Sequence, residues 1–346
     1  MRNANQLKVL RHLANEPLEQ RHFRGVERGT AVKSTSLVAT FAALRTEGLV
    51  EVSDVGNRKL YALTEAGRAE VSGGLIALPD SARILTFFNH AGGAAKTSSA
   101  RDIGYELAQL GYAVLLIDHD PQASLTRWLG VDTWGVERDA TLYPVLAAKG
   151  PLPTPLEVQG LALIPATVDL VAAEGDLQQD PFAFMRLRKA LEKAPHYDFI
   201  LIDAPPVAGR MALSAAYAAQ RLVVPIPVVR KGLDGLESTQ DLVQSLQSHI
   251  PGFGVLLYIP TQFDANVKAS QETLEQMRLR LPHVSPPLLR RPAAYNGAQL
   301  EGVPLGVYRP SDEARTEVQA VVNFLLTSLG LNPPTSSPLL ALQGAG

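Results

Sequence analysis

The stretch FNHAGGAAKTSSA, residues 88–100, constrains the fold of this chain more than any other. It follows the apolar run RILTFF, which reads as a buried strand, and it leads into residues 99–110, whose apolar residues recur at helical spacing. A glycine-containing turn between a strand and a helix presents unpaired N–H groups and the positive end of the helix dipole, and both suit phosphate. We therefore predict a phosphate-binding turn; a structural turn with a solvated lysine is the alternative.

Individual residues of this turn support the prediction. Gly92 and Gly93 let the backbone approach an anion closely. Lys96 can reach the β- and γ-phosphates of a nucleotide, and the Thr97 hydroxyl can bind Mg²⁺. We expect the nucleotide to contact the whole turn, namely Gly92, Gly93, Ala94, Ala95, Lys96, Thr97 and Ser98. Alanine at position 95 departs from the Walker A pattern, and it costs about 1–2 kcal/mol if that position needs a positive φ.

Composition excludes several classes of protein. The 346 residues contain no cysteine, which rules out disulfides, thiolate zinc sites and iron–sulfur clusters. No long uncharged apolar run or signal-peptide core is present, so we expect no membrane span. The lack of cysteine favours a cytoplasmic location, and the lack of a basic amphipathic helix in the tail argues against a membrane partner. Residues 1–74 carry 11 Lys and Arg against 8 Asp and Glu, a net charge of +3 that is compatible with nucleic-acid binding.

Two further motifs place carboxylates after apolar strands. LLIDHDPQ puts Asp118 and Asp120 at the end of one strand, and YDFILIDAPP puts Asp203 at the end of another. The carboxyl ends of parallel strands form the usual ligand crevice. One carboxylate can support Mg²⁺ while another orients a water for attack on the γ-phosphate. The alternative for the first motif is an Asp-x-Asp-Pro turn without chemistry.

The remaining pattern defines the fold class and the domains. Short apolar runs at 113–117, 161–164, 199–202, 221–224 and 254–259 alternate with helical stretches, so we predict an α/β domain with a doubly wound, mostly parallel sheet. Its predicted extent is 83–332. Residues 77–82 are the predicted linker, and the Pro- and Ser-containing residues 333–346 are a predicted disordered tail.

Residues 1–76 predict a small winged helix-turn-helix domain. We expect helices after Asn5, within 18–26 and over 31–47, the last with Val32, Leu37, Phe41 and Leu44 facing inward and ended by Gly48. Strands at 49–53 and 59–63 and a short helix from Thr64 follow. The phrase EGLVEVSDVGNRKLYALTEAGR resembles winged-helix regulators of the MarR and ArsR type. The resemblance implies that a third helix with Lys33, Ser34 and Ser36 enters the major groove and that Arg58 and Lys59 form the wing. Use of this domain for protein contacts alone is the alternative.

Four segments together resemble the ParA/MinD group of P-loop ATPases, and the ParA/Soj type matches best. These segments are FNHAGGAAKTSSA, LLIDHDPQASLTRWLG, YDFILIDAPP and VVPIPVVRKGLDGLEST. The resemblance covers about residues 83–330. It implies an ATP hydrolase that cleaves the β–γ phosphoanhydride with Mg²⁺, dimerises with ATP, binds nucleoid DNA non-specifically and is stimulated by a ParB-like partner during plasmid or chromosome partition.

The resemblance also implies roles for single residues. Lys96 and Thr97 would hold phosphates and Mg²⁺, Asp120 would position the attacking water, and Asp118 and Asp203 would support the metal. The segment VYRPS around Pro310, and TQFD at 261–264, resemble parts of the adenine site. Non-specific DNA contact would use basic residues late in the chain, namely Lys268, Arg278, Arg280, Arg290 and Arg291.

One departure from the family concerns its signature lysine, which corresponds to Ala91. That lysine neutralises charge across the dimer, so another basic residue would have to replace it; Arg210 and Lys231 are the candidates. A cargo-positioning branch that includes carboxysome-spacing ATPases also lacks the lysine. That branch and a winged-helix transcription regulator with a slow nucleotide switch are the alternative functions.

Overall fold

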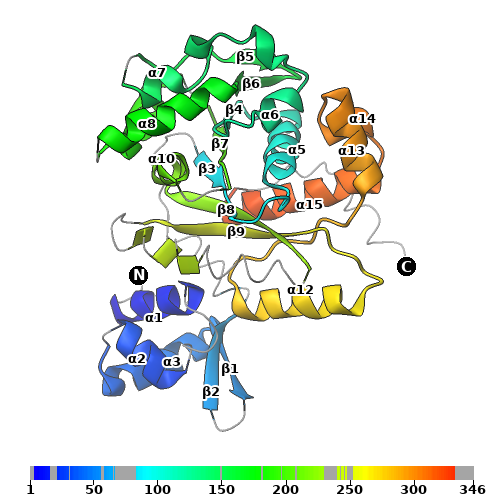
Figure 1. Ribbon diagram of the computed structural model, residues 1–346. Coiled ribbons are helices and arrows are strands. Elements are labelled where there is room, and N and C mark those ends of the chain that lie inside the picture. The colour runs from blue at the N-terminus through cyan, green and yellow to red at the C-terminus, as the bar shows by residue number, and fades with distance from the viewer. Residues whose placement is uncertain are drawn as a thin grey trace. The chain divides into compact units, whose positions relative to one another are not determined.

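A computed structural model describes most of the chain (Figure 1). The described residues are 4–15, 22–30, 32–55, 58–64, 66, 83–148, 150–180, 182–195, 197–206, 209–229, part of 240–247, and 252–331. The chain divides into two compact units; the first comprises 1–77, 275–284 and 326–332, and the second comprises 78–274, 285–325 and 333–346. The predicted linker and the predicted tail lie outside the described residues.

The N-terminal segment contains helices followed by a hairpin. The helices are α1 (Ala4–Asn15), α2 (Phe23–Thr30) and α3 (Ser34–Thr46), and the antiparallel strands are β1 (Val50–Val55) and β2 (Arg58–Leu63). The predicted strands and third helix agree with these bounds to within a few residues. The predicted second helix is displaced, because α2 begins at Phe23 and continues through Thr30, where the third helix was expected to open. Most of the short helix predicted from Thr64 lies outside the described residues.

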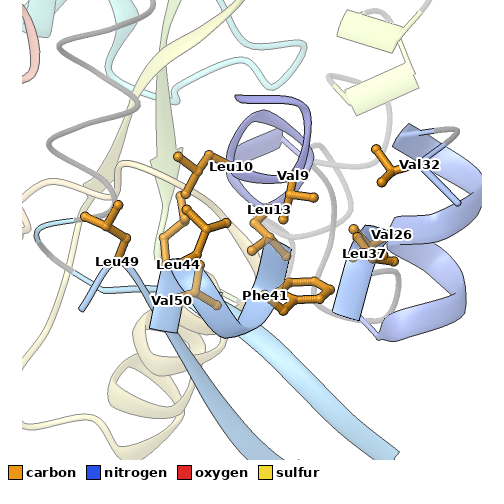
Figure 2. Packing of buried hydrophobic residues seen from close by; sticks show 11 residues of the cluster. Val9, Leu10, Leu13, Val26, Val32, Leu37, Phe41, Leu44, Leu49 and Val50 are labelled. Atoms are coloured by element: carbon orange, nitrogen blue, oxygen red, sulfur yellow. The ribbon is translucent and has the colours of Figure 1, made fainter. Parts of the chain in front are cut away.

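The side chains of this segment pack into one apolar cluster (Figure 2). The residues predicted to face inward from the third helix and its approach, Val32, Leu37, Phe41 and Leu44, are all buried there. The other members are Val9, Leu10, Leu13, Val26, Leu49, Val50 and Leu63. Gly48 follows α3 with φ +69°, as a glycine after the last helical residue should. The spacing of apolar residues therefore predicted the core of this segment.

The second unit contains a seven-stranded sheet with the order β5-β6-β4-β7-β3-β8-β9. The strands are β3 (Arg83–Phe87), β4 (Val114–Asp118), β5 (Leu156–Val158), β6 (Leu161–Ile164), β7 (Phe199–Asp203), β8 (Arg221–Pro227) and β9 (Gly254–Thr261). All neighbouring pairs are parallel except β5 with β6. The prediction of a mostly parallel α/β fold is confirmed, whereas the short edge strand β5 was missed.

Helices lie on both sides of this sheet (Figure 1). The helices that follow β3 along the chain are α5 (Lys96–Gln109), α6 (Ser124–Arg127), α7 (Tyr143–Leu146), α8 (Val171–Gln179), α9 (Arg186–Leu191), α10 (Arg210–Ala219), α12 (Lys268–Arg280), α13 (Pro292–Glu301), α14 (Leu305–Tyr308) and α15 (Glu313–Ser328). Because β4 and β8 lie on opposite sides of β3, right-handed crossovers place α5 and α10 on opposite faces. Among the described helices, none is long and apolar enough to span a bilayer.

The strand register brings the predicted carboxylates to one edge of the sheet. Asp118 at the end of β4 pairs with Asp203 at the end of β7, and Asp203 also pairs with Phe87 at the end of β3. Every residue of β4 and β7 is buried, so both strands sit in the middle of the sheet with polar residues only at their carboxyl ends. This edge is where the phosphate-binding turn also begins.

Candidate nucleotide-binding site

The turn after β3 is fixed at its start by a buried asparagine. The Asn89 side-chain amide donates to the carbonyl of Pro225 in β8 at 2.6 Å, and its Oδ1 accepts the N–H of Ala91 at 2.8 Å. Asn89 is fully buried. The neighbouring strand thus sets the direction in which the chain leaves β3.

The backbone of the turn has the form of an anion receptor. Gly93 and Ala95 adopt positive φ angles of +71° and +67°, and Ala95 is the residue that directly precedes α5. Within the described part of the chain, no backbone N–H of residues 92–98 donates a hydrogen bond to the protein. A run of unpaired N–H groups at a helix N-terminus binds phosphate. Position 95 thus has the positive φ that was the condition for strain at this alanine.

The end of β9 holds this turn from outside. The Gln262 side-chain amide donates to the carbonyl of Gly93 at 2.7 Å, and the Thr261 hydroxyl donates to the carbonyl of Ala94 at 3.3 Å. Both residues belong to the TQFD segment that was predicted to lie near the nucleotide. They occupy carbonyl groups of the turn and leave its N–H groups to a ligand.

Lys96 is the first residue of α5 and is only 7% exposed. Its Nζ donates to the carbonyl of Ala91 at 3.3 Å, so the side chain folds back over the turn. Burial lowers the pKa of Lys96, while the carboxylates of Asp203 and Asp120 act in the opposite direction. The ammonium group therefore lies among the predicted carboxylates and beside the free N–H groups.

Asp203 presents an unpaired carboxylate in the same place. It is 1% exposed, and neither of its oxygens has a hydrogen-bond donor among the described residues. Burial and the neighbouring Asp118 raise the pKa of Asp203 well above its ordinary value, and the Thr97 hydroxyl and the Lys96 ammonium oppose this. A buried carboxylate without donors is expensive unless a cation approaches it.

Asp120 faces the ligand cavity, whereas Asp118 does not. Asp120 lines the cavity, and its Oδ1 accepts the N–H of Gln122 at 2.9 Å. Asp118 is fully buried, and its oxygens accept hydrogen bonds from Thr126 and from the N–H of Asp120. Burial raises the pKa of Asp118 to about 6, although these hydrogen bonds lower it. The carboxylate of Asp118 is thus engaged within the protein, and its predicted role in supporting the metal stays a prediction.

The histidine between these aspartates was not singled out from the sequence. His119 is fully buried, its N–H donates to the carbonyl of Asp203 at 3.0 Å, and its Nε2 lies 3.1 Å from the carbonyl of Met211. Burial lowers the pKa of His119 to about 4. The backbone of His119 thus connects the end of β4 with β7, and its neutral imidazole contacts α10.

The cavity next to the turn has a volume of about 530 Å³. One wall consists of residues 92–99 of the turn and α5, together with Asp120, Gln122, Ser124 and Trp128. The opposite wall consists of residues 288–292, Tyr295, Asn296 and Gln299, with Val318 and Val321 of α15. Pro310 is exposed, does not line this cavity and accepts a hydrogen bond from Arg315 with its carbonyl; its contact with the nucleotide stays a prediction.

The opposite wall was missed because its position depends on a long-range backbone contact. Leu289 forms a parallel bridge with Phe263, just after β9, and Arg290 donates its N–H to the carbonyl of Phe263 at 2.8 Å. The feature of this wall that stands out in the sequence is the pair Arg290 and Arg291 before Pro292, and we predicted both as DNA contacts. Arg291 forms ion pairs with Glu313 and Glu317, whereas Arg290 is exposed at the cavity.

Of the two candidates for a cross-dimer cation, Arg210 lies among the described residues. Arg210 is the first residue of α10, and its N–H donates to Glu174 at 3.0 Å. Its side chain is half-buried and does not line the cavity of its own protomer. Lys231 lies outside the described residues.

The residues predicted to contact DNA occupy several elements. Lys33 directly before α3 and Lys59 in β2 are exposed, Ser36 is half-buried, and the Ser34 hydroxyl donates to Glu27. The side chain of Arg58 is not among those described. Arg278 and Arg280 of α12 are exposed, as is Lys268, which pairs with Glu272.

The donor set fits a magnesium nucleotide. Free N–H groups at the start of α5 suit the phosphates, and the buried, unpaired Asp203 beside Thr97 suits a hydrated divalent cation. Among the described residues, no cluster of three or more acidic or imidazole side chains forms a metal cage by itself.

Known proteins resemble this chain in sequence and in fold. A family model described as an AAA domain matches residues 82–252. The chain is 42% identical over 255 residues to the probable plasmid-partitioning protein ParA of Thermus thermophilus, covering 70% of this chain and 78% of that protein. It is 32% identical over 251 residues to the cell division protein PomZ of Myxococcus xanthus, covering 70% and 77%. Cobyrinic acid a,c-diamide synthase from Mycobacterium smegmatis, solved with an ATP analogue and magnesium, has a TM-score of 0.62 and 29% identity over 74% of this chain and 100% of that chain.

Proposed function

Because this chain belongs to the ParA/MinD family of P-loop ATPases, we propose that it is a ParA-type partition ATPase. It hydrolyses the β–γ bond of ATP, dimerises when ATP is bound, and segregates a plasmid or chromosome with a ParB-like partner. One observation carries this proposal: seven successive N–H groups, the Lys96 ammonium and the Asp120 carboxylate border one cavity.

Each residue of the site has a distinct role in this proposal. The N–H groups of residues 92–98 and the Lys96 ammonium bind the phosphates. Thr97 and Asp203 hold Mg²⁺, directly or through water. When bound, Mg²⁺ neutralises charge on the β- and γ-phosphates. Asp120 orients a water and accepts its proton, and it is suited to this because it is the aspartate of the β4 turn that faces the cavity.

A basic residue other than the missing lysine completes the site across the dimer. Arg210 is our first candidate, since it starts the helix that follows Asp203 and its guanidinium does not line its own cavity. Lys231 is the second candidate. Replacing both by alanine should abolish ATP-dependent dimerisation and lower hydrolysis; unchanged dimerisation and hydrolysis in the double variant would reject both.

DNA binding is assigned to two regions. The helices and hairpin of the N-terminal segment act as a winged helix, with Lys33, Ser34 and Ser36 reading the major groove and Arg58 and Lys59 on the wing. Arg278 and Arg290 contact nucleoid DNA without sequence preference. Affinity for random-sequence DNA should then fall steeply with added salt, and replacing either arginine should reduce the slope by about one phosphate contact.

The alternatives differ in turnover and cargo. A winged-helix regulator with a slow switch would bind ATP and an operator but show no DNA- or partner-stimulated hydrolysis. A cargo-positioning ATPase of the carboxysome-spacing type would hydrolyse ATP in the same way but position a different cargo. Mass measurement in solution with ATP, ADP or no nucleotide is the decisive first experiment, because the proposal requires a doubling of mass with ATP alone. A constant mass would contradict it.

A further inference from the structure

Asp118 and Thr126 form a buried pair that nothing so far accounts for. Both side chains are 0% exposed, and neither lines the cavity. Asp118 Oδ2 accepts two hydrogen bonds from Thr126, one from the backbone N–H at 2.8 Å and one from the hydroxyl at 2.7 Å. Two short hydrogen bonds to one carboxylate oxygen are strong, because the acceptor is charged.

The same pair reaches two other elements. Asp118 Oδ1 accepts the N–H of Asp120 at 3.2 Å. The Thr126 hydroxyl accepts the N–H of Ala166, which follows β6, at 2.9 Å. One hydrogen-bonded chain therefore joins the end of β4, the Asp120 turn, the helix α6 and the end of β6.

This hydrogen-bonded network lies directly behind one part of the cavity lining. Asp120, Gln122 and Ser124 line the cavity and belong to the short stretch that Asp118 and Thr126 close, and Trp128, which also lines the cavity, follows two residues after Thr126. A buried hydrogen-bond network that is fully satisfied holds its residues in one geometry. Because a displacement of about 1 Å costs roughly 100-fold in rate, the geometry of Asp120 needs such support.

We infer that Asp118 and Thr126 are positioning residues that hold the Asp120 carboxylate in place for hydrolysis. They act through Asp120 and touch neither nucleotide nor metal. The inference rests on the proposed ATPase function, and it assigns a role to Thr126, a buried residue that does not line the cavity. Asp118 thereby stabilises the turn after β4 and is not a metal ligand.

The test compares Thr126 with Thr86, a second threonine whose buried hydroxyl donates a hydrogen bond. Thr126→Val removes the hydroxyl and keeps the side-chain shape, and Thr126→Ser restores the hydroxyl. Thr86→Val is the matched control, because the Thr86 hydroxyl is equally buried and donates to the carbonyl of Ala215 at 2.7 Å, away from the turn. Full-length protein is used throughout.

Steady-state kinetics give the first result. We expect Thr126→Val to lower kcat roughly 10- to 100-fold while KM for ATP changes less than about threefold, since the phosphate-binding turn is untouched. Thr126→Ser should stay close to the parent, and Thr86→Val should change kcat little. Equal losses of kcat in Thr126→Val and Thr86→Val, or a rise in KM alone, would overturn the inference.

A double-mutant cycle separates positioning from direct catalysis. Asp118→Asn and Thr126→Val break the same network, so the double variant should lose little more kcat than the more damaging single variant. If Asp118 acted on the metal independently, the two losses would multiply. Multiplying losses would therefore overturn the shared role.

A fluorescence measurement keeps the test independent of turnover. Trp134→Phe leaves Trp128 as the single tryptophan, and Trp128 lies two residues after Thr126 in the cavity wall. In this background Thr126→Val should raise the acrylamide quenching of Trp128 about twofold through loosening of the network, whereas Thr86→Val should not. Absence of hydrolysis in the parent would contradict the proposed ATPase, and unchanged quenching would contradict the positioning role.

Discussion

The turns after β3 and β4 enter their helices through the same backbone conformation but differ in how their N–H groups are hydrogen-bonded. Each follows a buried parallel strand, and each enters its helix through an alanine with a positive φ, +67° at Ala95 and +52° at Ala123. In the first turn, the N–H groups of residues 92–98 have no acceptor among the described residues. In the second, Asp118 and Asp120 occupy the local N–H groups with their own carboxylates.

The difference explains the chemistry at this edge of the sheet. A turn held from outside, by Gln262 and Thr261, keeps its donors available for an anion. The turn after β4 is held by its own side chains, and it keeps the carboxylate of Asp120 fixed at the cavity. Binding and bond cleavage are therefore assigned to separate turns, and variants of each should affect separate kinetic constants.

Lys96→Ala should have the largest effect. The change removes the ammonium that faces the phosphates, so kcat/KM should fall on the order of 1000-fold and nucleotide binding should weaken. The measurement is ATP turnover together with binding of a fluorescent ATP analogue. Lys268→Ala is the control, because Lys268 is exposed and pairs with Glu272 at 3.6 Å. Retained turnover in Lys96→Ala would remove the basis for assigning binding to the first turn.

Asp120→Asn should affect the chemical step alone. The amide cannot accept a proton from water, so kcat should fall about 100-fold while affinity for ATP stays within a few-fold. Asp132→Asn is matched to it, since Asp132 Oδ1 likewise accepts the N–H two residues on, that of Trp134, at 3.1 Å. A loss of ATP binding in Asp120→Asn as large as in Lys96→Ala would show that binding and hydrolysis are not assigned to separate turns.

Gln262→Ala should have a smaller effect, confined to binding. It deletes the hydrogen bond to the Gly93 carbonyl, which is worth about 1 kcal/mol, so Kd for ATP should rise about fivefold. Gln271→Ala removes a similar bond, from the side-chain amide to the carbonyl of Ala265 at 2.6 Å, outside the cavity. Titration calorimetry with ATP measures both. An equal effect of the two variants would mean that β9 does not hold the turn for its ligand.

The two strained alanines should respond in the same direction and with the smallest effects. Replacing Ala95 or Ala123 by glycine removes about 1–2 kcal/mol of strain and adds about 0.5–1 kcal/mol of unfolded-state entropy, so each should raise the free energy of unfolding by about 0.5–1 kcal/mol. Ala100→Gly, inside α5, should lower it by about 1 kcal/mol. Urea unfolding measures all three. Destabilisation by Ala95→Gly would show that the loop tolerates alanine without strain.

The sequence predicted those parts of the fold that depend on local apolar pattern. The central strands were placed because β4 and β7 are continuous apolar runs that end in aspartate. Leu37, Phe41 and Leu44 were correctly assigned to the core because they repeat at helical spacing. The start of α2 was missed because its cap is unusual: the His22 ring Nδ1, rather than a Ser, Thr, Asp or Asn oxygen, accepts the N–H of Gly25.

The site was predictable on one side only. The turn and the strand-end aspartates carry motifs, whereas the opposite wall depends on the bridge between Phe263 and Leu289. The orientation of Asp118 depended on Thr126, eight residues later, whose hydroxyl gave no signal in the sequence. Motifs therefore located the chemistry, and tertiary contacts decided which carboxylate faces it.

The distance along the chain between the two cavity walls has a consequence for biosynthesis. Residues 92–99 leave the ribosome long before residues 288–299, roughly ten to forty seconds earlier at 5–20 residues per second. The turn itself is complete only when Pro225 and Gln262, which hold it, have also been made. Stabilisation by nucleotide can begin only after residues 288–299 have followed, so a chain terminated before them gains none of it.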